Sequence, residues 1–175
     1  MSFVLIVKFN VLFKKIIKRF TIFLLSITTF AYKNKYQQKW QKLLLSVVGV
    51  NLGNENEISE ELYIWDGSRI NIGSKNIIGL NCKLWDFADI TINDGCLISH
   101  NLTIVAGTHN EVDLSYVAGP VVIGSNCWIG VNVTIVGPVC IGDNVIIGAG
   151  SLVLRDLPKD TVCYGVPCKA MRSRI

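Results

Sequence analysis

The residue best suited to acid–base chemistry is His109, one of only two histidines in the chain. It lies in the stretch A-G-T-H-N-E-V-D-L-S-Y-V-A-G-P (residues 106–120), which interrupts an otherwise regular pattern. An imidazole can accept a hydroxyl proton at neutral pH and pass it on. Because a hydroxyl activated in this way can attack a thioester directly, no serine or cysteine nucleophile is required. We therefore predict that His109 acts as a general base on an alcohol.

Such a base needs a partner for its second ring nitrogen. Glu111 and Asp113 are close in sequence, but a backbone carbonyl would serve as well, and the sequence leaves these alternatives open. His100, in contrast, falls within the regular pattern, so we expect a corner or surface residue there.

The elements that position His109 follow a period of six residues. Aliphatic residues mark this period, with two kinds of interruption, at positions 72, 78, 84, 92, 98, 104, 123, 129, 135, 141, 147 and 153. A period of six is neither the 2 of a strand nor the 3.6 of a helix. It is typical of a triangular coil in which three short parallel strands make one turn and the marker residues point inward. This predicts an all-β body over residues 55–160, with a protruding loop at 106–120.

The cysteines fit the interior of such a coil. Cys82, Cys96 and Cys127 occupy small positions four residues after a marker, where side chains are also expected to point inward. None of the six cysteines forms a CxxC pair, which argues against a zinc ribbon or a thioredoxin-like site. No convincing signal peptide precedes them. We interpret them as reduced core residues of a cytoplasmic protein.

Charge divides the chain into two parts. Residues 1–54 hold nine Lys or Arg and no Asp or Glu, whereas the rest holds 17 − 9 = 8 basic and 13 acidic residues. An acidic body argues against nucleic-acid binding. In residues 1–42 the apolar side chains share one arc of a helix, and each apolar run is shorter than the ~20 residues that span a bilayer. This predicts an amphipathic helical arm that lies in a membrane interface through residues 1–40, or packs on the body or on a neighbouring subunit.

The body also carries a family resemblance. Its I-G-x-x-x-x hexads and the segments 91–104, 107–110 (G-T-H-N), 123–130, 141–151 and 165–172 resemble the left-handed parallel β-helix acyltransferases. Within these, the chain is similar to the galactoside, maltose and nodulation-factor O-acetyltransferases, whose relatives modify capsular and exopolysaccharides. The resemblance covers roughly half of the chain. It implies a left-handed parallel β-helix of hexapeptide repeats, preceded by the helical arm (1–54) and followed by a C-terminal tail (161–175).

The resemblance implies roles for individual residues. His109 matches the family's catalytic histidine, Asn81 its active-site asparagine, and Asp86 would bind an acceptor hydroxyl. The residues that match coenzyme A contacts are Trp128, Ala149, Arg155, Lys169 and Arg172, with the three cations facing phosphates. Two departures stand out: Val131 replaces a serine that contacts the cofactor, and W-D-F-A-D (85–89) differs from the sugar-acetylating relatives.

The function implied is acetyl transfer from acetyl-CoA, as co-substrate, to a sugar hydroxyl of a cell-surface polysaccharide or its lipid-linked precursor. The resemblance also implies a homotrimer with sites between subunits, located in the cytoplasm or peripherally on the cytoplasmic face of the inner membrane. An N-acetyltransferase acting on a nucleotide-linked amino sugar and a non-catalytic hexapeptide scaffold remain the alternatives. We expect no metal, because a zinc carbonic anhydrase built on this helix needs three histidines and the chain has two.

Overall fold

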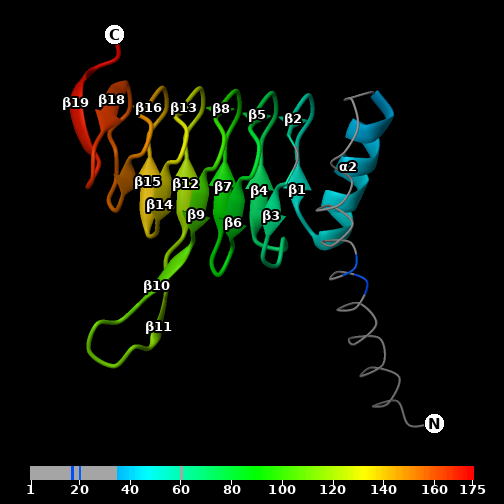
Figure 1. The fold of residues 1–175 in the computed structure, drawn as a ribbon, viewed down its shortest axis with the longest axis horizontal. Helices are drawn as coiled ribbons and strands as arrows, with labels where there is room; N and C mark the ends of the chain where they lie inside the picture. The colour runs from blue at the N-terminus through cyan, green and yellow to red at the C-terminus, as the bar shows by residue number, and fades with distance from the viewer. Residues whose placement is uncertain (1–16, 18–19, 21–34, 60) are drawn as a thin grey trace.

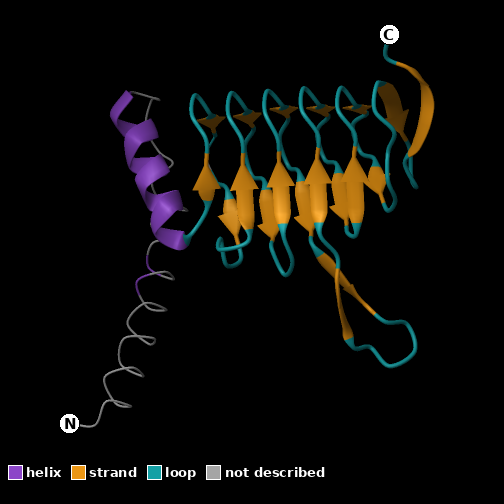
Figure 2. Cartoon of the chain, turned by 180° about the vertical axis from the view of Figure 1, so that it is seen from behind, coloured by secondary structure: helices purple, strands orange, loops and turns teal. Residues whose placement is uncertain are grey.

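The chain winds into a column of short parallel strands (Figure 1). The computed structural model describes residues 17, 20, 35–59 and 61–175. A helix, α2 (Lys35–Val48), stands at one end of the column, and an antiparallel pair of strands closes the other end. A hairpin projects sideways from the middle, as the view from behind also shows (Figure 2).

The strands form three faces, which the chain visits in turn. The first face contains β1 (Asn51–Leu52), β4 (Ile70–Ile72), β7 (Ile90–Ile92), β12 (Val121–Ile123) and β15 (Val139–Ile141). The second contains β2 (Glu57–Ile58), β5 (Ile77–Ile78), β8 (Leu97–Ile98), β13 (Trp128–Ile129), β16 (Ile146–Ile147), β18 (Thr161–Tyr164) and β19 (Lys169–Ser173). The third contains β3 (Tyr63–Ile64), β6 (Lys83–Trp85), β9 (Thr103–Val105), β14 (Thr134–Val136) and β17 (Leu152–Val153).

Inward aliphatic side chains fill the column. On the first face, the strand register stacks Ile72, Ile92, Ile123 and Ile141 in one ladder, and each is at most 3% exposed. Full burial of one such side chain contributes about 1.5–3 kcal/mol. Cys82, Cys96 and Cys127 are buried beside these ladders, as predicted. The parallel β-helix of hexapeptide repeats expected from the sequence is therefore confirmed.

One corner, between the third and first faces, absorbs the changes in coil length, and we call it the hairpin corner. Asn71 pairs with Thr91, 20 residues later, whereas Val122 pairs with Cys140, 18 residues later. The longest insertion leaves this corner after β9 and folds into a hairpin of β10 (Gly107–His109) and β11 (Tyr116–Ala118). The predicted loop at 106–120 is thus a two-stranded hairpin.

Asparagines form the corner between the second and third faces. Asn81, Asn101 and Asn132 adopt left-handed backbone angles, with φ of 54°, 61° and 57°. Asparagine tolerates this region because its short side chain can hydrogen-bond locally. The Asn81 side-chain amide donates to Oδ1 of Asn101 at 2.8 Å, which links two successive coils. We call this edge the asparagine corner.

Helix α2 covers the N-terminal end of the interior. Leu45 and Val48 are each 1% exposed and join the core. Gly49, with φ of 101°, ends the helix, and the N–H of Val50 donates to the Leu45 carbonyl at 3.0 Å. The body begins at Asn51 rather than at residue 55, so the last part of the predicted arm packs on the body.

Most of the apolar stripe predicted for the arm lies outside the described residues. Ile17 and Phe20 are described, and they are 40% and 59% exposed. In the part of the chain that the structure describes, no helix is long and apolar enough to cross a membrane.

The predicted C-terminal tail extends the second face. Strand β18 pairs in parallel with β16, and β19 turns back antiparallel onto β18. Cys163 and Cys168 are buried at this end, at 0% and 1% exposure. Residues 161–173 are therefore part of the sheet and not a separate segment.

Candidate active site

A backbone carbonyl orients the His109 ring. Nδ1 of His109 lies 2.9 Å from the carbonyl oxygen of Leu114, on the opposite arm of the hairpin. Since a carbonyl can only accept, Nδ1 carries the hydrogen in this bond, and Nε2 is left with its lone pair. The structure therefore chooses among the three partners that the sequence left open, and it provides the tautomer that a general base needs.

The turn of the hairpin directs the Leu114 carbonyl toward the ring. Leu114 has a φ of 56°, which is rare for a residue with a branched side chain. Its N–H donates to the Asn110 carbonyl at 2.9 Å, and the Asn110 N–H donates to the Ser115 carbonyl at 2.8 Å. These bonds close the turn from both sides and hold Leu114 in the left-handed conformation.

The nearby carboxylates serve the turn and not the imidazole. Asp113 Oδ1 accepts the Ser115 hydroxyl at 2.6 Å and the Ser115 N–H at 3.0 Å. These two bonds, the hydroxyl first, lower the pKa of Asp113 below its ordinary value. Glu111 is exposed in the same turn.

The Asp86 side chain is occupied within the hairpin corner. It is 1% exposed, and its two carboxylate oxygens accept the N–H groups of Asp66 at 2.8 Å and Gly67 at 2.7 Å. A sugar hydroxyl would have to compete with both bonds. Asp86 thus fixes the preceding coil of the corner, a role that sequence reasoning did not anticipate.

The residues predicted to contact coenzyme A lie mainly along the second face. Trp128, on β13, points outward and is 48% exposed, as its position beside a marker predicted. Ala149 is exposed in the turn after β16, on the asparagine corner that also carries Asn81. Lys169 and Arg172 extend from β19 at the end of this face.

The second face also presents an apolar column around Trp128. Register pairs Ile77 with Leu97, Leu97 with Trp128, and Trp128 with Ile146 across four successive strands. Ile77 and Leu97 are each 44% exposed. Exposed apolar columns of this kind mark contact surfaces.

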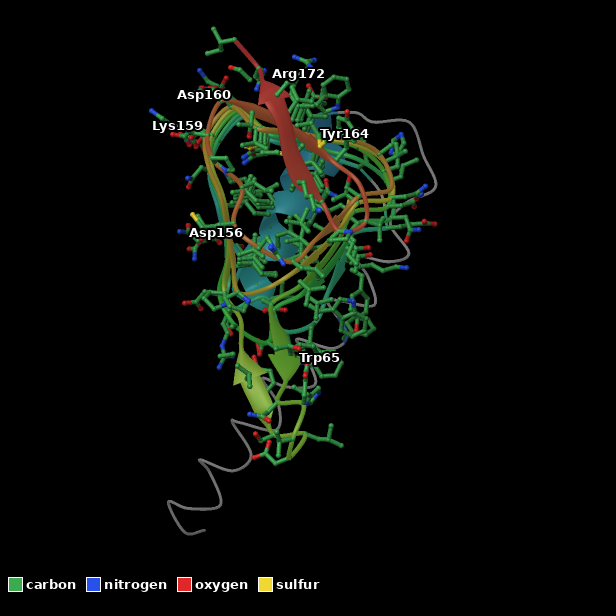
Figure 3. All side chains as sticks on the ribbon, turned by 90° about the vertical axis from the view of Figure 1, so that its left-hand side faces the viewer. Trp65, Asp156, Lys159, Asp160, Tyr164 and Arg172 are labelled. Atoms are coloured by element: carbon green, nitrogen blue, oxygen red, sulfur yellow. The ribbon has the colours of Figure 1, made fainter. Side chains whose placement is uncertain are left out.

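The single chain does not bring His109 together with these residues. Figure 3, which looks along the column from its C-terminal side, places Arg172 across the column from the hairpin. Of the predicted cofactor residues, Arg155 shares the hairpin corner, in the bend that follows β17. Asn81 lies on the asparagine corner and so on a different edge from His109.

The hairpin tip presents apolar side chains outward. Val112 is 94% exposed and Leu114 73% exposed, at the far end of β10 and β11. Both this tip and the apolar column on the second face would be covered if a second subunit supplied the other half of the site.

Two features of the site escaped sequence reasoning. The role of Leu114 depends on a left-handed φ that no residue-type pattern announces for leucine. The rings of Trp65, Trp85 and Phe87 gather at the hairpin corner, and their 20- and 22-residue spacings from Trp65 could have shown this once the coil length was known.

The buried thiols do not offer a nucleophile. Burial raises the pKa of Cys82 and Cys168, and a hydrogen bond with Cys96 together with burial raises that of Cys127 well above its ordinary value. Among the described residues, no group of three or more His, Cys, Asp or Glu side chains is placed to hold a metal ion.

Comparison with known proteins identifies the class. Residues 120–155 match the bacterial transferase hexapeptide (six repeats) family. Galactoside O-acetyltransferase of Escherichia coli (strain K12) is 38% identical over 84 residues, which cover 45% of this chain and 41% of that protein. The putative colanic acid biosynthesis acetyltransferase WcaF of the same strain is 29% identical over 150 residues, 85% of this chain and 82% of that protein. The chain thus spans less than half of the first relative and most of the second.

The fold agrees with the sequence matches. A solved galactoside acetyltransferase in complex with coenzyme A superposes with a TM-score of 0.79 at 29% identity, covering 91% of this chain and 80% of that one. The chain is a hexapeptide-repeat β-helix, similar in sequence and in fold to the O-acetyltransferases of the galactoside group.

Proposed function

We propose that this protein transfers an acetyl group from acetyl-CoA to a sugar hydroxyl of a cell-surface polysaccharide or its lipid-linked precursor, with His109 as general base. The enzyme class is the coarser part of this statement: the chain is an acetyl-CoA-dependent acetyltransferase, in line with its relatives. The observation that supports the finer part is the bond between Nδ1 of His109 and the Leu114 carbonyl, because it leaves Nε2 ready to take a proton.

In this mechanism the acceptor oxygen attacks the thioester carbonyl carbon while Nε2 of His109 removes the hydroxyl proton. The tetrahedral intermediate then collapses, the carbon–sulfur bond breaks, and the proton passes from Nε2 to the departing thiolate. The oxygen that becomes negatively charged needs a donor. Asn81 is our candidate for this donor, and it would have to exchange its present bond to Asn101 for one to the intermediate.

The coenzyme A phosphates require cations. Arg155, Lys169 and Arg172 are exposed on the C-terminal part of the column, whereas the body as a whole is acidic. Fixed cations of this kind give charge-assisted hydrogen bonds to phosphate oxygens. The exposed ring of Trp128 would cover the pantetheine arm, and Val131 would leave one cofactor hydrogen bond unmade.

A homotrimer would complete the site. The predicted cofactor residues lie mostly on the second face and asparagine corner, whereas His109 stands on the hairpin. We propose that the apolar hairpin tip of one subunit packs against the second face of the next, so that His109 and Trp128 come from different chains.

The acceptor and location are the least constrained parts of the proposal. The putative colanic acid biosynthesis enzyme WcaF aligns with most of this chain, which supports a polysaccharide acceptor. The basic arm would bring such an enzyme to the cytoplasmic face of the inner membrane, where lipid-linked glycans are assembled.

The general-base assignment is tested by His109→Ala. We expect kcat for acetyl transfer to fall by about 10²–10⁴ while coenzyme A binding, measured by calorimetry, stays unchanged. The acceptor is found by screening candidate glycans with acetyl-CoA and scoring the mass gain of one acetyl group. His100→Asn is the matched control: His100 Nδ1 accepts the Leu80 N–H at 2.8 Å, which an Asn oxygen can replace, so activity should persist. Equal activity of His109→Ala and wild type would disprove the assignment.

A further inference from the structure

Five aromatic side chains line the hairpin corner and end beside His109; we call them the aromatic strip. They are Tyr63, Trp65, Trp85, Phe87 and Tyr116. Ring centroids are 5.8 Å apart for Trp65 and Trp85, 6.1 Å for Trp85 and Phe87, and 6.4 Å for Phe87 and Tyr116. The strip is continuous, because every neighbouring pair is within the range of aromatic contact.

The strip is exposed rather than part of the core. Trp65 is 53% exposed, Tyr116 50% and Tyr63 36%, and Trp85 and Phe87 are half-buried between them. Figure 3 shows Trp65 on the side of the column from which the hairpin projects. Exposed rings in contact with each other are costly unless a ligand or partner covers them.

The strip leads directly to the candidate base. The Tyr116 ring lies 6.4 Å from the His109 ring in an edge arrangement, and the two residues pair across β10 and β11. From the coil of Trp65 to the coil that carries the hairpin are two coil steps, or about 10 Å. This length exceeds one pyranose ring.

Polar side chains run beside the rings. On the third face the register places Tyr63 next to Lys83, and Lys83 next to Thr103, all on the outer surface. A sugar chain matches this alternation, because its C–H faces are attracted to the negative faces of aromatic rings while its hydroxyls need hydrogen-bond partners. A lipid chain would leave Lys83 and Thr103 without partners.

We propose that the aromatic strip binds the acceptor as a chain of two or more sugar units, with the reacting unit at His109 and a remote unit stacked on Trp65. This inference rests on the proposed function and adds the size of the acceptor to it. Trp65 and Trp85 are specificity-determining residues in this arrangement, since they touch only the units that do not react.

The test uses malto- and galacto-oligosaccharides of one to five units with the full-length protein and acetyl-CoA. For wild type we expect kcat/KM to rise with chain length up to about three units. Trp65→Ala should lower kcat/KM for the three-unit acceptor by about three- to tenfold and leave the one-unit acceptor unchanged. Trp40→Ala is the matched control, because Trp40 is 63% exposed on α2 and lies outside the strip.

Binding without acetyl-CoA separates this inference from the proposed function. If no sugar is acetylated but wild type binds the longer oligosaccharides more tightly, by saturation-transfer NMR, and Trp65→Ala removes that preference, the strip is supported and the acetylation proposal fails. Acetylation or binding that is independent of length, an unchanged length dependence in Trp65→Ala, or no binding of either series would overturn the strip. A change of oligomeric mass in Trp65→Ala, or loss of its binding to phosphatidylglycerol vesicles, would overturn it in favour of a subunit contact or a membrane.

Discussion

At the scale of single residues, the base depends on the backbone of Leu114. The carbonyl of this residue reaches Nδ1 of His109 only because Leu114 holds a φ of 56°. Glycine adopts this conformation without strain, whereas a β-branched residue pays about 1–3 kcal/mol for it. The turn therefore stores strain that keeps the imidazole in one orientation.

We predict opposite effects for two substitutions at Leu114. Leu114→Gly should keep kcat within a few-fold of wild type, and Leu114→Val should lower it by about tenfold or more, because the strained turn rearranges and the ring loses its acceptor. Steady-state kinetics measure both, and coenzyme A binding should be the same in each variant. If Gly is as harmful as Val, the Leu114 side chain and not its backbone supports the site.

The cysteines give a second prediction at this scale. Of the six thiols only Cys140 is exposed, and burial raises the pKa of Cys82 and Cys168. The thiolate is the form that reacts with disulfide reagents, so native protein at pH 8 should show one fast thiol. Cys140→Ser should abolish the fast phase, and the other five should react only after unfolding. A fast phase that persists in Cys140→Ser would show that the column opens locally.

At the scale of elements, the inward ladders hold each coil and the outward positions do not. On β12, Val121 and Ile123 are fully buried and Val122 between them is 37% exposed. The strand thus contains a buried site and its control on neighbouring residues. The same alternation sets which side chains are free to meet a ligand or subunit.

We predict that Ile123→Ala lowers the free energy of unfolding by about 2–5 kcal/mol, because it leaves a cavity in the ladder. Val122→Ala should change it by less than about 0.5 kcal/mol. Urea unfolding followed by circular dichroism compares the two. Similar losses would mean that the first face is covered in the assembled protein.

At the scale of the whole molecule, one chain carries two halves of a site that face different directions. His109 is on the hairpin, and Trp128 is on the second face. A three-fold assembly can unite them only across a subunit boundary. This arrangement predicts complementation between inactive variants.

We expect His109→Ala and Trp128→Ala each to be poorly active alone, and a co-refolded mixture of the two to regain activity, since mixed trimers contain one intact site at a suitable boundary. Light scattering checks the trimer, and native mass spectrometry checks that the chains have mixed. The double variant His109→Ala/Trp128→Ala, mixed with His109→Ala, is the control and should stay inactive. Mixed trimers without recovered activity would place both residues in one chain's site.

Much of the fold was predictable because the hexads repeat a local rule. A marker such as Ile92 must point inward whatever precedes it, so the period alone predicted the ladders, the inward Cys96 and the break that contains His109. The starts and ends were less predictable. The body begins at Asn51, and residues 161–173 join the second face, because sheet pairing and not the hexad decides where a coil closes.

The amino-acid sequence by itself determined the β-helix and the imidazole at its interruption, since both follow from residue type and spacing along the chain. Only the tertiary structure decided that Leu114 orients His109, that Asp86 is occupied by backbone N–H groups, and that four rings gather next to Tyr116. These relations join residues from different coils or from opposite arms of a turn. Their distances depend on coil length and backbone angles, which are properties of the folded column.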